Sequence, residues 1–103
     1  MSVLKITQNN FDNEIMKSQK TVLLDFYADW CGPCRMVSPL VDEIAEEHPQ
    51  YLVGKINVDE EPGLAAAFGV ASIPTLVVIK DGKVVQQSAG ARPKAQILAM
   101  LKG

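Results

Sequence analysis

The sequence predicts an α/β fold in which helices cover both faces of a mixed β-sheet. In the first two thirds of the chain, apolar β-forming runs alternate with helical runs, a pattern typical of βαβ units with parallel strands. In the last third, two short β-forming runs flank Asp81-Gly82, a pair typical of a type I′ turn. We therefore expect parallel strands followed by an antiparallel hairpin.

The first elements are a short helix and a buried strand. Asn9 or Asn10 can cap a helix that ends near Ser18. Its shared apolar face is formed by Phe11 and Ile15. The run Thr21–Tyr27 (TVLLDFY) is almost continuously apolar, as expected for a central strand covered on both faces. Asp25 interrupts this run and is therefore expected to be buried.

An amphipathic helix of several turns is predicted from Cys34 onward. Apolar residues recur there at helical spacing, namely Met36, Val37, Leu40, Val41, Ile44 and Ala45. Pro39 lies within this helix and removes one backbone hydrogen bond, so we expect a kink at that point.

The second half contains three more strands and two more helices. Tyr51–Val58 is predicted as a buried strand, and the segment from Asp59 through Pro62 is a good helix start, with Gly69 as its stop. The hairpin strands are Thr75–Ile79 and Lys83–Gln87. A final helix is expected to begin near Pro93, with a core stripe formed by Ile97, Leu98 and Leu101.

Composition and charge limit the function classes. The 103 residues are 48% hydrophobic and show no repeat or linker, so we predict one domain over residues 1–103. The formal net charge is −2, and neither sign forms a run of five or more residues, which gives no electrostatic case for nucleic acid or an anionic membrane as a partner. No apolar stretch is long enough for a transmembrane helix, and the N-terminus is too polar for a signal peptide. We expect a cytoplasmic location.

Both cysteines of the chain, Cys31 and Cys34, lie three residues apart. A disulfide between them would close only a small loop and add little stability, so reactivity or metal binding is the better interpretation. Half of a zinc site has the same spacing, but His48 is the only histidine and there is no second thiol pair. We therefore favour a redox pair and expect no metal.

Helix geometry allows the two cysteines to form and break a disulfide. Residues three apart in a helix have Cα atoms about 5 Å apart, within the range for a disulfide. Gly32 allows a tight entry into the helix, and Pro33 preorganises its first turn. The helix N-terminus favours a thiolate at Cys31, which is the predicted nucleophile. Cys34 lies one turn inside, is expected to be less exposed, and is the predicted resolving thiol.

Asp25 is the candidate base for the proton that Cys34 must lose. Burial should raise the pKa of its carboxyl toward neutrality. Lys55, the only charged residue in the neighbouring predicted strand, could pair with Asp25 and moderate this shift. Alternatively, Asp25 is a buried acid satisfied by hydrogen bonds, without a catalytic role. Trp30 could likewise be an ordinary surface aromatic or part of a contact surface.

The chain resembles the thioredoxin family over essentially its full length. The resemblance is carried by DFYADWCGPCR, by Pro39, and by KINVDEEPGLAAAFGV, SIPTLVVIKDGK and AGA in the same order. It implies a three-layer fold with a four- or five-stranded sheet and four helices. It also implies a monomeric protein-disulfide reductase that binds no cofactor and receives electrons from NADPH through a separate flavin-containing reductase, with disulfide-containing proteins as substrates.

The resemblance also implies roles for individual residues. Cys31 corresponds to the nucleophile, Cys34 to the resolving thiol, Asp25 to the buried acid and Lys55 to its partner. Pro74 corresponds to a cis-proline that faces the disulfide. The apolar rim that receives extended substrate segments corresponds to Trp30, Gly32, Pro33, Ile73, Gly90 and Ala91.

Other positions bear on the direction of the reaction and on partners. Oxidising relatives often carry a histidine between the cysteines, whereas Gly32-Pro33 adds no charge that stabilises the thiolate, which favours a reductase. Tyr27 stands where many members have tryptophan, and Ala71 where a basic residue is frequent, so partner choice could differ. A second hypothesis is a binding module whose redox state gates association through the surface around Trp30, Ile73 and Gly90.

Overall fold

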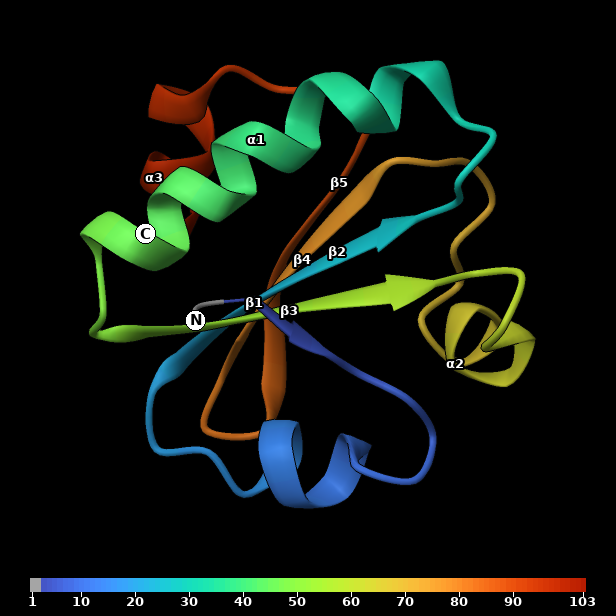
Figure 1. Ribbon diagram of the computed structural model, residues 1–103. Helices are drawn as coiled ribbons and strands as arrows, with labels where there is room; N and C mark the ends of the chain where they lie inside the picture. Colours follow the sequence, from blue (N-terminus) through green and yellow to red (C-terminus); the bar gives the residue numbers. More distant parts are fainter. Residues whose placement is uncertain (1–2) are drawn as a thin grey trace.

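The computed structural model of the protein describes residues 3–103, which form one five-stranded mixed sheet with helices on both faces (Figure 1). The strand order is β1-β3-β2-β4-β5. The parallel strands are β1 (Val3–Lys5), β3 (Tyr51–Asn57) and β2 (Thr21–Tyr27). The antiparallel strands are β4 (Thr75–Lys80) and β5 (Lys83–Ala89). The predicted α/β class and mixed sheet are confirmed.

The hairpin turn has the backbone that its sequence predicts. Asp81 has φ of 52° and Gly82 has φ of 76°, and a type I′ turn requires positive φ at both positions. Strand β1 was not predicted from its own pattern, because three residues are too few to show a period. It pairs with β3 at the edge of the sheet.

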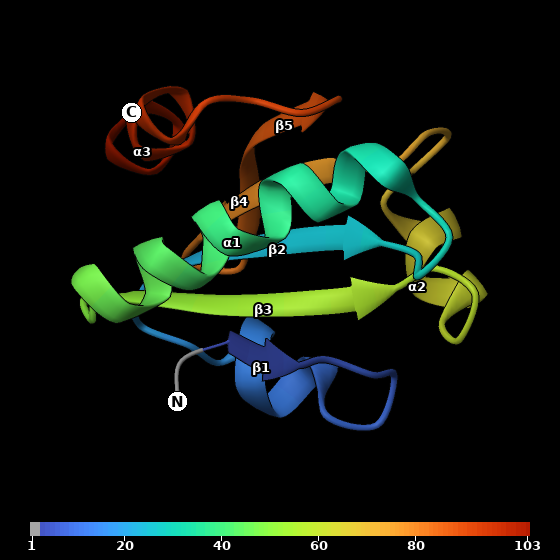
Figure 2. The same ribbon diagram turned by 45° about the horizontal axis from the view of Figure 1, so that its top comes forward.

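Helices cover both faces of the sheet (Figures 1 and 2). Helices α1 (Gly32–Glu47) and α3 (Lys94–Lys102) pack on one face. Helices η1 (Asp12–Met16) and α2 (Pro62–Ala67) pack on the other. The Lys94 ammonium joins the helices of the first face, since it lies 3.0 Å from a carboxylate oxygen of Glu43 and 2.6 Å from one of Glu47.

Two details of the helices differ from the expectations. The first helix is a five-residue π-helix without a side-chain cap, because the Asn10 Oδ1 atom accepts a hydrogen bond from the Thr7 N–H instead. Helix α1 continues through Pro39 without interruption, and the kink expected there stays a prediction.

Strand β2 places Asp25 beneath helix α1. Successive strand residues point to opposite faces of a sheet. Val22, Leu24 and Phe26 belong to the core cluster shared with η1 and α2, whereas Leu23 belongs to the cluster under α1 and α3. Asp25 shares the face of Leu23, so its carboxyl points toward the helix that carries the cysteines.

The backbone at Gly54 in β3 packs tightly against the Ile6 side chain. A Cβ atom there would lie 2.7 Å from the Ile6 Cγ1 atom, so we expect Gly54→Ala to lower the free energy of unfolding by about 1–3 kcal/mol. Gly63 in α2 is the matched control, since its added Cβ would meet no atom within 4 Å. Gly63→Ala should raise stability by about 0.5–1 kcal/mol. Urea unfolding checks both, and equal effects would contradict the packing described.

Candidate active site

The two cysteines meet at the N-terminus of α1. They form a disulfide with their Cα atoms 5.3 Å apart, within the range expected from their spacing. Cys31 is the N-cap residue, and its sulfur accepts a hydrogen bond from the Cys34 N–H at 3.2 Å. The Cys31 N–H in turn donates to the Ala28 carbonyl oxygen at 3.2 Å. The first turn of the helix is thus built around the disulfide.

The predicted difference in exposure between the cysteines is not present in the disulfide form. Cys31 and Cys34 are each only 4% exposed. The physical reason is that both pack into one small cluster with Ala28, against Val58 and Ile73 from distant parts of the chain. The difference between the sulfurs lies in their surroundings, because Cys31 caps the helix while Cys34 lines a pocket below it.

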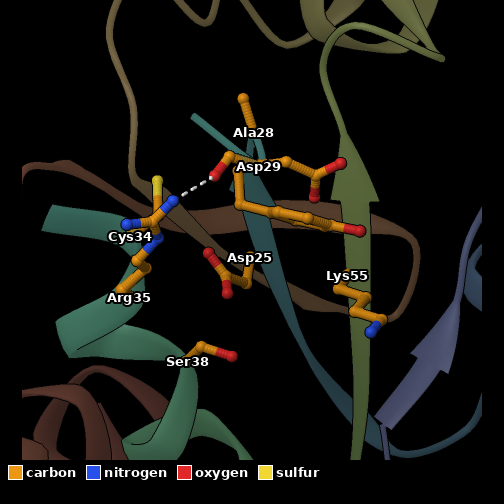
Figure 3. Close-up of a pocket in the computed structure, with 8 residues that line it drawn as sticks. Asp25, Ala28, Asp29, Cys34, Arg35, Ser38 and Lys55 are labelled. Carbon is orange, nitrogen blue, oxygen red and sulfur yellow. Dashed lines mark hydrogen bonds between the residues drawn. The ribbon is translucent and has the colours of Figure 1, made fainter. Parts of the chain in front are cut away.

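That pocket joins Cys34 to the buried acid (Figure 3). It has a volume of about 220 Å³. Its lining residues come from the end of β2, the loop that follows it, the first half of α1 and the neighbouring strand β3. They are Asp25, Tyr27, Ala28, Asp29, Cys34, Arg35, Ser38 and Lys55. The Arg35 guanidinium donates to the Asp29 carbonyl oxygen at 3.1 Å, which holds one wall in place.

Asp25 is a buried carboxyl whose pKa lies near neutral pH. The residue is only 4% exposed, and within residues 3–103 its Oδ1 atom has no hydrogen-bond partner. Burial raises the pKa of Asp25 to about 7, with a further upward contribution from the negative charge of Asp42 and an opposing one from Lys55. The structure agrees with the upward shift expected from the sequence.

Lys55 does not form the direct pair with Asp25 that the sequence suggested. The two residues are in register on adjacent strands, yet no ion pair between them occurs in the described part of the chain. The Lys55 side chain is exposed, and its ammonium lies 5.9 Å from the centre of the Tyr27 ring. A long lysine side chain keeps its charge in water, because burying an ion pair costs solvation. Lys55 therefore acts on Asp25 only through space.

Of the residues expected to form the substrate rim, Ile73 packs against the two cysteines. Trp30 is 68% exposed, and its indole N–H donates to a carboxylate oxygen of Asp59 at 2.8 Å. The Ile73–Pro74 peptide bond is cis, and the Pro74 carbonyl oxygen accepts from the Gly90 N–H at 2.8 Å. A groove of about 350 Å³ is lined by Trp30, Val58, Val70, Ala71, Ser72 and Ile73. The remaining rim residues, Gly32, Pro33, Gly90 and Ala91, are all exposed.

Three residues near the site were not singled out from the sequence. Ser38 lines the pocket, Asp42 acts on the Asp25 charge, and Asp59 fixes the Trp30 ring. A usable signal existed for two of them, because Cys34, Ser38 and Asp42 follow each other at intervals of four and so share one face of a helix. Asp59 is brought to Trp30 by the fold, and nothing local in the sequence indicates it.

Comparison with known proteins decides the family. The protein-family model described as Thioredoxin matches residues 2–103. The chain belongs to the thioredoxin family. It is 49% identical over 102 residues to a thioredoxin of Pyropia yezoensis, covering 98% of this chain and 95% of that protein. It is 48% identical over 92 residues to a thioredoxin of Chlorobaculum thiosulfatiphilum, covering 88% and 85%.

A solved structure shows the same thioredoxin fold. A mutant thioredoxin from Halobacterium salinarum superimposes with a TM-score of 0.91 at 38% identity, covering 98% of this chain and 88% of that one. Thioredoxins are thiol–disulfide oxidoreductases, and the disulfide between Cys31 and Cys34 fits that chemistry. The general partners of the family are disulfide-containing substrates and the reductases that recharge it. Among residues 3–103, no helix has the length and apolar character to cross a membrane.

Proposed function

We propose that this thioredoxin reduces protein disulfides with Cys31 as the attacking thiol, Cys34 as the resolving thiol and Asp25 as the proton acceptor. The Cys31 thiolate attacks one sulfur of the substrate disulfide and releases the other as a thiolate. The Cys34 thiol then loses its proton, attacks the Cys31 sulfur and releases the second substrate thiolate. Two electrons pass to the substrate, and the Cys31–Cys34 disulfide remains.

One observation carries the role of Asp25: its carboxyl and Cys34 line the same pocket. A base is most useful when its pKa lies near the working pH, and the pKa of Asp25 is raised to about 7. In the carboxylate form it can take the Cys34 proton, directly or across a water molecule in the pocket. Lys55, which lines this pocket too, favours the carboxylate and tunes that step.

Replacing Asp25 with asparagine tests this role. We expect Asp25→Asn to slow resolution of a preformed mixed disulfide about 100-fold at pH 7, since general-base catalysis contributes at least that much. The rate of the native protein should rise with pH up to a midpoint near 7, as the carboxylate forms, and the variant should lose this rise. Stopped-flow measurement of substrate release reports both. Unchanged kinetics from pH 5 to 9 would exclude the role.

The electron source and the partners are part of the same proposal. We infer that NADPH reduces the disulfide through a separate flavin-containing thioredoxin reductase, and that the chain acts as a cytoplasmic monomer on disulfide-containing proteins. The match over residues 2–103 supports one thioredoxin domain over 1–103, and a reducing compartment suits the reaction. NADPH oxidation coupled to insulin reduction tests the electron route, and the absence of NADPH-dependent reduction with a bacterial thioredoxin reductase would count against it.

The exposed groove beside Trp30 supports redox-gated binding as a second candidate function. The groove lies next to the disulfide, so opening the disulfide could alter the surface that a partner meets. A reduction assay with insulin and dithiothreitol separates the two functions. If the protein is a disulfide reductase, it is expected to accelerate insulin reduction. If it is only a binding module, it would not do so, and the partners of the native protein would still bind the Cys31→Ser variant normally.

A further inference from the structure

The two edges of the sheet differ in their protection against pairing with another strand. The edge strand β1 has three residues, and Lys5 at its end is charged. The opposite edge strand, β5, has seven residues, and residues 84–89 carry no charge (Figure 2). Short length and charge are common devices that keep an edge from pairing. The edge at β5 therefore lacks the protection that β1 has.

Only one half of β5 is regular enough to accept another strand. The pairing of β5 with β4 skips Val85, and a bulge of this kind disturbs an edge. Residues 86–89 pair with β4 in continuous register. They lead directly into Gly90, whose N–H donates to the Pro74 carbonyl oxygen at 2.8 Å. The regular half of the strand thus runs into the expected substrate rim.

A groove of about 440 Å³ lies between this half of β5 and helix α3. Gln86, Gln87 and Ser88 line it from the strand, and Gln96 and Met100 line it from the helix. Glutamine amides can donate to and accept from a peptide backbone, and a methionine side chain adapts to apolar contacts. An extended peptide can also pair with a free strand edge through main-chain hydrogen bonds. The groove therefore suits an extended peptide.

Arg92 gives this groove a positive charge. Among the described residues that line the groove, it is the only charged one. Its Nε–H group donates to the Ser88 hydroxyl oxygen at 2.7 Å, which holds the guanidinium beside β5. This bond uses only one of the guanidinium N–H groups, and the planar fork of the others matches a carboxylate. The charge of the groove therefore favours a peptide with an acidic side chain.

We propose that residues 86–89 and helix α3 bind an extended acidic segment of the substrate protein, as a continuation of the rim at Gly90 and Ala91. The inference rests on the proposed function, because it adds a binding surface for the same substrates. The segment adds a strand to the edge of the sheet, and one of its carboxylates pairs with Arg92. The groove contributes to substrate affinity and leaves the exchange chemistry unchanged.

A peptide disulfide with an extended arm of about eight residues tests this surface, since that length spans the regular half of β5 and the rim. One version of the arm carries two glutamates, a second carries two glutamines, and a third peptide has no arm. Reduction of each peptide is followed with dithiothreitol as the electron donor. We expect the glutamate version to have a KM about threefold below that of the glutamine version, as for an exposed ion pair, and the same kcat.

Arg92→Gln is the central variant, and Lys83→Gln is its matched control. Lys83 is a cation at the other end of β5 and does not line the groove. Arg92→Gln should remove the preference for glutamate, whereas Lys83→Gln should keep it. Neither variant should change reduction of the peptide without an arm. Both positions are exposed, so both variants should fold.

N-methylation of the arm tests whether it pairs as a strand. Alternate residues of a paired strand turn their N–H groups to the same side. Methylation of one alternate set should therefore raise KM to the value of the peptide without an arm, and methylation of the other set should leave KM unchanged.

Four results would overturn the inference. These are equal KM values for the two arms, a glutamate preference that survives Arg92→Gln, an equal response to both methylated sets, and a dimer of the native protein that the arm dissociates. In the last case a second copy of the chain would occupy the edge. If the protein does not accelerate reduction of the peptide without an arm, it is instead the proposed function that fails.

Discussion

Insulin reduction by the Cys31→Ser variant should fall by a factor of about 10³ or more. A serine hydroxyl in place of the Cys31 sulfur cannot form a nucleophile at neutral pH, so the first exchange step has no attacking group. The fold should survive, because the disulfide closes a loop of very few residues and adds little stability. Turnover is measured by following insulin reduction with dithiothreitol, after subtraction of the uncatalysed rate.

The Cys34→Ser variant is the matched comparison, and it should fail at a different step. Cys31 can still attack in this variant, so a covalent adduct with the substrate should accumulate and be visible by mass spectrometry. The variant that lacks both thiols should form no adduct. Adducts with Cys31→Ser instead of Cys34→Ser would reverse the roles of the two cysteines. Adducts trapped from cell extract with Cys34→Ser would identify the natural substrates.

The stability of the native protein should fall as the pH rises from 5 to 8. The pKa of Asp25 is raised to about 7 in the folded protein from an ordinary value of 3.8. Between these two values the folded state binds a proton that the unfolded state does not, so the free energy of unfolding decreases with increasing pH. Each pKa unit corresponds to about 1.4 kcal/mol, which gives a loss of about 2.5 kcal/mol between pH 5 and pH 8.

Asp25→Asn is the control for this pH dependence. Asparagine does not titrate, so the difference between the two proteins isolates Asp25 from every other ionisable group. Urea unfolding of the disulfide form at pH 5, 6, 7 and 8 should give a difference that changes by about 2.5 kcal/mol in favour of the variant. A constant difference across this range would mean that Asp25 titrates normally.

The sequence predicts four of the five strands and the redox pair because their patterns are local, whereas β1 is too short to show a pattern. The i, i+3 spacing of Cys31 and Cys34 limits their distance, and the period of two in β2 turns Asp25 toward α1. The turn at Asp81-Gly82 follows from the backbone preferences of the two residues. These features depend on a few neighbours in the chain, so they can be derived before any tertiary contact is known.

The remaining features depend on contacts between distant segments. Cys31 and Cys34 are equally covered because Val58 and Ile73 reach them from other parts of the fold. Lys55 is correctly expected beside Asp25, but its side chain extends into solvent because its charge is better solvated there. Strand register alone does not specify that direction. That Ser38 lines the pocket with Asp25 is seen only when the fold is known, although its spacing from Cys34 is visible in the sequence.

The proposed role of Asp25 requires a buried carboxyl that holds its proton close to neutral pH. The direct measurement is a ¹³C NMR titration of the Asp25 carboxyl in the disulfide form, with Asp25→Asn used to assign the signal. We predict a midpoint near 7, caused first by burial of the carboxyl and then by the charge of Asp42. A midpoint near 4, the ordinary value for an exposed aspartate, would contradict the proposed role of Asp25.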